Sequence, residues 1–75
     1  MNEVQLIVEE LALYGVITSF CYGLCEGKGI LWSVHCARFA KWGLNGEFDE
    51  PLAAESLLHA AEIARVECRK RGWIK

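Results

Sequence analysis

The stretch "VITSFCYGLCEGKGILWSVHCARF", residues 16–39, contains two runs of β-branched and aromatic side chains on either side of a glycine-containing centre. The first run extends from Val16 to Cys25, and the second extends from Ile30 to Phe39. Residues 26–29, Glu-Gly-Lys-Gly, have the composition of a tight turn. We therefore predict an antiparallel β-hairpin, and the rest of the fold has to be built around it.

A turn centred on Gly27 and Lys28 sets the register that we expect for this hairpin. It pairs Cys25 with Ile30, Gly23 with Trp32, Cys21 with Val34 and Ser19 with Cys36. Side chains alternate between the two faces of a strand. One predicted face therefore carries Ile17, Cys21, Cys25, Ile30, Trp32, Val34 and Cys36. The other predicted face carries Phe20, Tyr22, Leu24, Leu31, His35 and Phe39.

Helical patterns lie on both sides of the hairpin. A first helix is predicted from Glu3 to Leu13, because apolar residues recur there at helical spacing behind an Asn2 N-cap. Gly15 is expected to end it. A second helix is predicted from about Leu52 to Arg71, with Pro51 at its first position and Gly72 after its end.

Residues 40–44 are predicted to form a short third strand that ends near Trp42, before a turn at Asn45-Gly46. The element order is then helix, hairpin with a short third strand, helix. We expect one α+β domain over residues 1–75, with both helices on one face of a small antiparallel sheet. The cysteine-bearing face is predicted to contact the alanine-rich second helix, and a register that buries the aromatic side chains is the alternative.

The composition predicts more apolar surface than one small core can cover. The chain has 75 residues, of which 53% are hydrophobic, and both faces of the hairpin are apolar. Helices on one side leave the other face open, so we predict that the aromatic face binds a protein partner or a second copy of the chain. The predicted partner-binding residues are Phe20, Tyr22, Leu24, Leu31, His35 and Phe39, together with the acidic Glu47, Asp49 and Glu50.

The four cysteines are interpreted as small apolar packing residues. Cys21 and Cys25 on one strand would lie roughly 13 Å apart, which is too far to share one metal ion. His35 points to the opposite predicted face from Cys36, which argues against a thiol–imidazole nucleophile. We therefore expect no catalytic residue, metal or cofactor. A disulfide site, or a small enzyme or metal protein that uses the thiols and His35, is the alternative.

The charges are sorted along the chain. The formal net charge is −2, whereas residues 65–75 contain five basic residues and one acidic residue. The overall charge argues against a protein whose main task is to neutralise phosphates. A nucleic-acid-binding or regulatory module that uses the basic tail stays open as the alternative function, with Arg69, Lys70, Arg71 and Trp73 as its contacts. The sequence shows neither an export signal nor a membrane span, so a cytoplasmic location is expected.

Three segments resemble the very small acidic proteins encoded by bacteriophages and prophages, a set that includes anti-CRISPR proteins. They are "MNEVQLIVEEL" at residues 1–11, "GILWSVHCARFAKWG" at residues 29–43 and "AAESLLHAAEIARVECRKRGWIK" at residues 53–75. The resemblance implies a stoichiometric inhibitor that binds a CRISPR effector complex in the bacterial cell and blocks DNA binding or nuclease recruitment. Such inhibitors share no single motif, so the resemblance assigns no residue a role.

Overall fold

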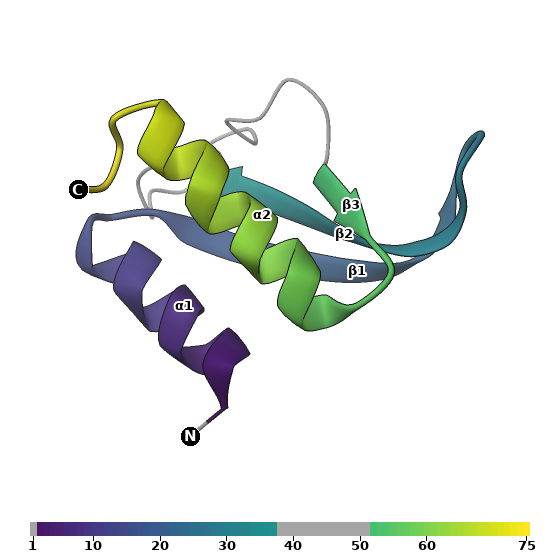
Figure 1. Ribbon diagram of the computed structural model, residues 1–75, viewed down its shortest axis with the longest axis horizontal. Coiled ribbons are helices and arrows are strands. Elements are labelled where there is room, and N and C mark those ends of the chain that lie inside the picture. The colour runs from purple at the N-terminus through teal and green to yellow at the C-terminus, as the bar shows by residue number, and fades with distance from the viewer. Residues whose placement is uncertain (1, 38–51) are drawn as a thin grey trace.

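The computed structural model describes residues 2–37 and 52–75 (Figure 1). The elements are α1 (Glu3–Leu13), β1 (Ile17–Cys25), β2 (Gly29–Ala37), β3 (Leu52–Ala54) and α2 (Leu57–Lys70). The strands form one antiparallel sheet in the order β1-β2-β3, and both helices lie over the same face of it. The predicted α+β class and its order of helix, hairpin, short strand and helix are confirmed. The strand predicted to end near Trp42 lies outside the described residues.

Helix α1 has the predicted bounds because local signals fix both ends. The Asn2 side-chain oxygen accepts a hydrogen bond from the Gln5 backbone N–H at 2.7 Å. At the other end, the Val16 N–H donates to the Leu11 carbonyl at 3.0 Å around Gly15. The last turn of the helix therefore leads directly into β1.

Helix α2 begins later than predicted, because Ser56 caps it. The Ser56 hydroxyl accepts a hydrogen bond from the His59 N–H at 3.1 Å, and the helix starts at Leu57. The predictions of a start at Leu52 and of Pro51 at the first helical position are wrong. Residues 52–54 form β3 instead, where they pair with residues 32–34 of β2. A strand partner for β2 outweighs the helical propensity of three residues.

The predicted end of α2 is confirmed. Gly72 has φ 75°, in the left-handed region, and the Trp73 N–H donates to the Cys68 carbonyl at 3.0 Å. This turn reverses the chain so that Ile74, one residue before the C-terminus, is buried in the core.

The register of the hairpin differs from the prediction by one residue. Cys25 lies opposite Gly29, and Phe20 lies opposite Val34. The Lys28 N–H donates to the Cys25 carbonyl at 2.9 Å, and Gly27 has φ 77°, as the third residue of a type II turn requires. The loop between the paired Cys25 and Gly29 therefore has three residues, 26–28, and the predicted two-residue centre at residues 27 and 28 is wrong.

This shift changes the faces of β1 and leaves those of β2 as predicted, because side chains alternate with a period of two. On β2, the buried Val34 and Cys36 face the helices and His35 faces away, as predicted. On β1, Phe20 faces the helices and packs against the core, whereas Cys21 is exposed on the other face. The prediction that cysteines of β1 face the core is therefore wrong.

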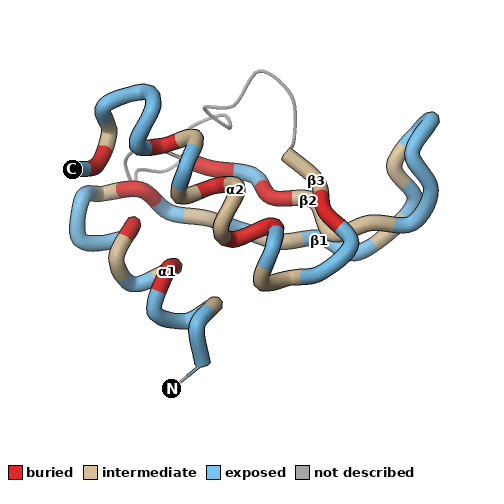
Figure 2. The backbone as a smooth tube through the Cα atoms, viewed as in Figure 1, coloured by how far each residue is buried: buried red, intermediate tan, exposed pale blue. Residues whose placement is uncertain are grey.

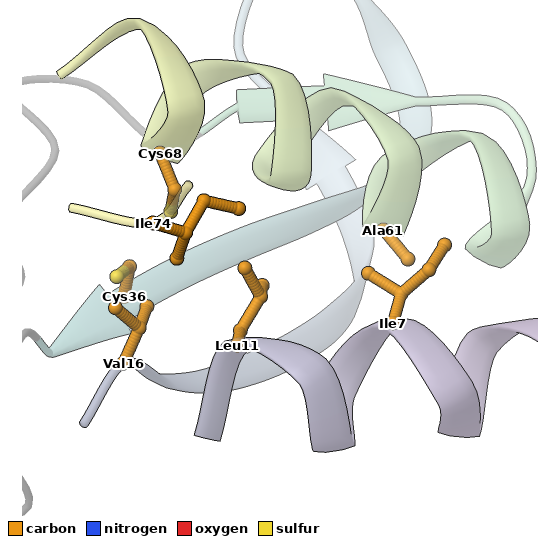
Figure 3. Close-up of a cluster of buried hydrophobic side chains, with 7 residues drawn as sticks. All are labelled: Ile7, Leu11, Val16, Cys36, Ala61, Cys68 and Ile74. Atoms are coloured by element: carbon orange, nitrogen blue, oxygen red, sulfur yellow. The ribbon is translucent and has the colours of Figure 1, made fainter. Parts of the chain in front are cut away.

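The core lies where both helices cover the sheet. Figure 2 shows buried positions concentrated there, and the far end of the hairpin exposed. Close approach of α2 to the sheet is possible because its buried residues are small: Ala60, Ala61, Ala64 and Cys68. One buried cluster, drawn in Figure 3, joins the helices, the sheet and the C-terminal residues: Ile7, Leu11, Val16, Cys36, Ala61, Cys68 and Ile74.

The register predicts effects of different size for substitutions at two adjacent residues of β1. Phe20→Ala removes a ring that packs on the core cluster, so the free energy of unfolding should fall by about 2 kcal/mol. Cys21→Ala changes an exposed side chain and should alter it by less than about 0.5 kcal/mol. Urea denaturation of both variants measures the difference. A larger loss of stability for Cys21→Ala than for Phe20→Ala would support the register predicted from the sequence, in which Cys21 faces the core.

Thr18 holds a buried hydroxyl oxygen with no hydrogen-bond partner within the described residues. Such a group is costly, and an apolar replacement of the same shape removes that cost. Thr18→Val should raise the free energy of unfolding by about 1 kcal/mol, or Tm by about 4–8 °C. Thr18→Ser keeps the hydroxyl and should bring no gain in the same thermal scan. Equal stabilisation by both variants would refute the assignment.

Candidate functional site

The hairpin continues beyond the part of the sheet that the helices cover (Figure 1). Among the described residues, β3 pairs with residues 32–34 of β2, so Trp32 is the last position of β2 with a second partner strand before the turn of the hairpin. We call the face formed there by Tyr22, Leu24, Ile30 and Trp32 the hairpin arm. Tyr22 is 62% exposed, Leu24 82% and Ile30 61%. The arm is thus an apolar surface that continues the core-facing side of the sheet into solvent.

Cross-strand pairing organises the arm. Tyr22 lies opposite Trp32, and their ring centroids are 5.0 Å apart with an interplanar angle of 47°. Leu24 lies opposite Ile30 one step closer to the turn. Aromatic and aliphatic cross-strand pairs of this kind stabilise a hairpin and hold the side chains in fixed positions. The arm therefore presents a preformed apolar surface.

The structure distributes the predicted partner-binding residues over both faces of the sheet. Tyr22 and Leu24 are exposed on the arm, whereas Phe20 on the same face packs against the core. Leu31 and His35 lie on the opposite face. The predicted partner-binding residues that the structure describes therefore do not form the single aromatic surface that we predicted. The remaining four predicted residues lie outside the described residues: Phe39, Glu47, Asp49 and Glu50.

Sequence reasoning missed Ile30 and Trp32 as members of the arm because it placed the whole helix-facing side of β2 in the core, whereas the helices do not cover that side near the turn. The missing signal is the turn: three residues, 26–28, separate the paired Cys25 and Gly29, and both Gly27 and Gly29 have positive φ. With that register, Ile30 joins Leu24 and Trp32 joins Tyr22 on one face.

The cysteines fall into two groups. Cys36 and Cys68 are buried, as expected for packing residues, whereas Cys21 is exposed and Cys25 is half-buried. No disulfide joins any two of these four cysteines. In residues 2–37 and 52–75, no three His, Cys, Asp or Glu side chains come together in a way that could hold a metal ion.

The thiol of Cys36 interacts with Cys68 across the interface between β2 and α2. Its hydrogen bond to Cys68 lowers the pKa of the Cys68 thiol below its ordinary value. The positive charge of Arg71 acts in the same direction, whereas burial and the Glu67 carboxylate act against it. The Cys68 thiol is therefore more acidic than an ordinary cysteine thiol.

The basic tail is held by contacts within the fold. The Arg65 and Arg69 guanidinium groups lie 3.6 and 3.7 Å from the Glu10 carboxylate of α1. The Arg71 Nε donates to Glu67 at 3.0 Å. Three of the five basic residues of this segment thus have a carboxylate beside them, which reduces their capacity to neutralise phosphates.

Trp73, another predicted tail contact, is half-buried, and the Arg71 guanidinium lies over its ring at 5.1 Å. The ring also packs against the core cluster. Both features are those of a side chain that docks the end of α2. Lys70 is exposed beside them.

Comparison with known protein families, curated protein sequences and solved structures finds no match to this chain. In the part of the chain that the structure describes, neither helix has the length and apolar character needed to cross a bilayer.

Two neighbouring residues of the tail should differ in their contribution to stability. Arg71→Ala removes both the Glu67 contact and the stacking on Trp73, so the free energy of unfolding should fall by about 1 kcal/mol. Lys70→Ala should change it by less than about 0.5 kcal/mol. Chemical denaturation at low ionic strength measures both. If both variants lost the same free energy of unfolding, the contacts of Arg71 with Glu67 and Trp73 would not be the cause of the loss.

Proposed function

We propose that this chain is a non-enzymatic protein-binding inhibitor that contacts its partner through the hairpin arm. The observation that carries the proposal is the exposure of Tyr22, Leu24 and Ile30 on one face, beside the Trp32 ring. Aromatic side chains held in a fixed position are the preferred anchors of protein–protein interfaces, because little conformational entropy is lost when they bind. Exposed apolar groups of this kind are covered in a complex.

The edge of β1 supports a second contact in the same interface. Among the described residues, β1 pairs on one side only, with β2. Its nine residues, ITSFCYGLC, contain no charged side chain and no proline, the features that commonly protect an edge strand from pairing. A partner strand added to this edge would lie beside the arm. The partner surface that would fit both the hairpin arm and the edge of β1 is therefore an apolar groove with an extended segment beside it.

The resemblance to phage-encoded inhibitors supports a bacterial CRISPR effector complex as the partner to test first, in the cytoplasm of the host cell. Binding there would block access of DNA or of a nuclease to the complex. Inhibition would be stoichiometric, since the mechanism is occupation of a surface. The alternative of a nucleic-acid-binding module has less support, because Arg69 and Arg71 already contact carboxylates.

The test compares the wild type with an arm variant, Tyr22→Ser/Leu24→Ser, and with a matched control, Leu13→Ser. Leu13 is 84% exposed on α1, outside the arm, so Leu13→Ser should fold like the wild type. The arm variant loses the Tyr22–Trp32 pair, so its circular dichroism spectrum is compared with that of the wild type before the binding test. In quantitative pull-downs from a bacterial lysate that contains a CRISPR effector complex, the wild type and Leu13→Ser should enrich the same partner. The arm variant should recover at least about tenfold less, since loss of anchors costs more than about 1.4 kcal/mol.

Titration of the purified partner then tests the inhibitor function. Target-DNA binding or cleavage by the effector complex should fall until one equivalent of the wild-type chain has been added, and should not fall further with time. Equal capture by the arm variant would refute the arm as the interface. Inactivation that continues at substoichiometric amounts would refute a non-enzymatic mechanism.

A further inference from the structure

Cys36 and Cys68 meet in the core although they are 32 positions apart in the sequence. Cys36 lies on β2 with 1% of its surface exposed, and Cys68 lies on α2 with none exposed. Their side chains enter the same buried cluster beside Val16 and Ile74 (Figure 3). The thiols are within hydrogen-bonding contact of each other. The fold thus brings two thiols together across the interface between its helical layer and its sheet.

This contact differs from an ordinary arrangement of buried cysteines. The two side chains come from different layers, so a bond between them would fix α2 to β2. A disulfide requires the two sulfurs to approach to about 2 Å, so rotation of the two side chains has to bring the thiols from contact to that distance. The exposed Cys21 and the half-buried Cys25 share one strand face at non-adjacent positions, so they have no comparable contact with each other.

We propose that Cys36 and Cys68 form an intramolecular disulfide when the chain meets a small-molecule disulfide such as oxidised glutathione. The Cys68 thiolate attacks one sulfur of the reagent, and the first glutathione thiolate leaves. The Cys36 sulfur then attacks the Cys68 sulfur of the mixed disulfide, and the second glutathione leaves. The two protein protons end on the glutathione thiolates. Two protein thiols are thereby oxidised, and one reagent disulfide is reduced to two thiols.

The roles of the two sulfurs follow from their surroundings. Cys68 lies near the positively charged Arg71 and accepts the hydrogen bond of Cys36, and both features favour its thiolate. Cys36 is then correctly placed as the resolving thiol. Because both residues are buried, attack on the reagent requires a transient opening of α2 from the sheet. Oxidation should therefore be slow in the folded state and fast during refolding.

The consequence is a redox-dependent stability. The bond would close a loop that contains residues 37–67, and such cross-links stabilise mainly by restricting the unfolded chain. The hairpin arm lies at the other end of β2, so its exposed face is unaffected. This inference does not depend on the protein-binding proposal, since it concerns a different end of the sheet.

The test uses the full chain refolded from guanidinium in mixtures of oxidised and reduced glutathione, so that burial does not limit the reaction. After alkylation of the remaining thiols, peptide mapping by mass spectrometry should show one bond, between Cys36 and Cys68, among the six pairs that four cysteines allow. The variant Cys21→Ser/Cys25→Ser should form the same bond with a mass loss of about 2 Da. Its Tm should rise by roughly 10 °C on oxidation.

Single variants provide the control. Cys36→Ser in the same Cys21→Ser/Cys25→Ser background retains one thiol, so it should form only a mixed disulfide with glutathione and show no rise in Tm. The proposal is overturned if the double variant keeps two alkylatable thiols in the most oxidising buffer. It is also overturned if the wild type forms another pair in preference, or if the bond forms without a gain in Tm.

Discussion

The pairing of Phe20 with Val34 is the constraint on which the rest of the structure depends. Because successive side chains of a strand alternate between faces, this one pair decides which residues of β1 and β2 meet the helices. It gives the helices a surface of Phe20, Val34 and Cys36. Helix α2 meets that surface with alanines, so the two layers approach closely enough for a small core to be well packed.

The same alternation explains why an apolar surface remains outside the core. The helix-facing side of β1 and β2 continues toward the turn, where Tyr22 and Trp32 follow Phe20 and Val34 as the next pair. At that point β3 ends and the helices no longer cover the sheet (Figures 1 and 2). The hairpin arm is therefore a part of the core-facing side that has no second layer.

The elements that local chemistry fixes could be predicted from the sequence. Both ends of α1 depend on residues within a few positions, such as Asn2 at its start, and its bounds were predicted correctly. The start of α2 could not be predicted in this way, because Pro51 and Ser56 are both good start signals. The choice between them depends on the pairing of residues 52–54 with β2, which is a contact between distant parts of the chain.

The register could not be read from the hydrophobic pattern because both faces of β1 are apolar, so either register buries hydrophobic side chains. Only the turn distinguishes the two registers, through the three residues that it places between Cys25 and Gly29. For the same reason, the candidate site was predicted in part. Tyr22 and Leu24 were expected at an exposed surface, but their neighbours Ile30 and Trp32 were assigned to the core.

The two ends of the sheet have different physical demands. At one end, Cys36 and Cys68 lie in a tightly packed interface where any change of volume is costly. At the other end, Leu24 and Ile30 add nothing to the core and keep apolar surface in contact with water. A 75-residue domain has little stability to spare, and exposed apolar groups favour aggregation. The exposed part of this surface lies outside the core and opposes solubility, and a partner that covers it would remove that cost. This is the structural argument for the proposed binding function.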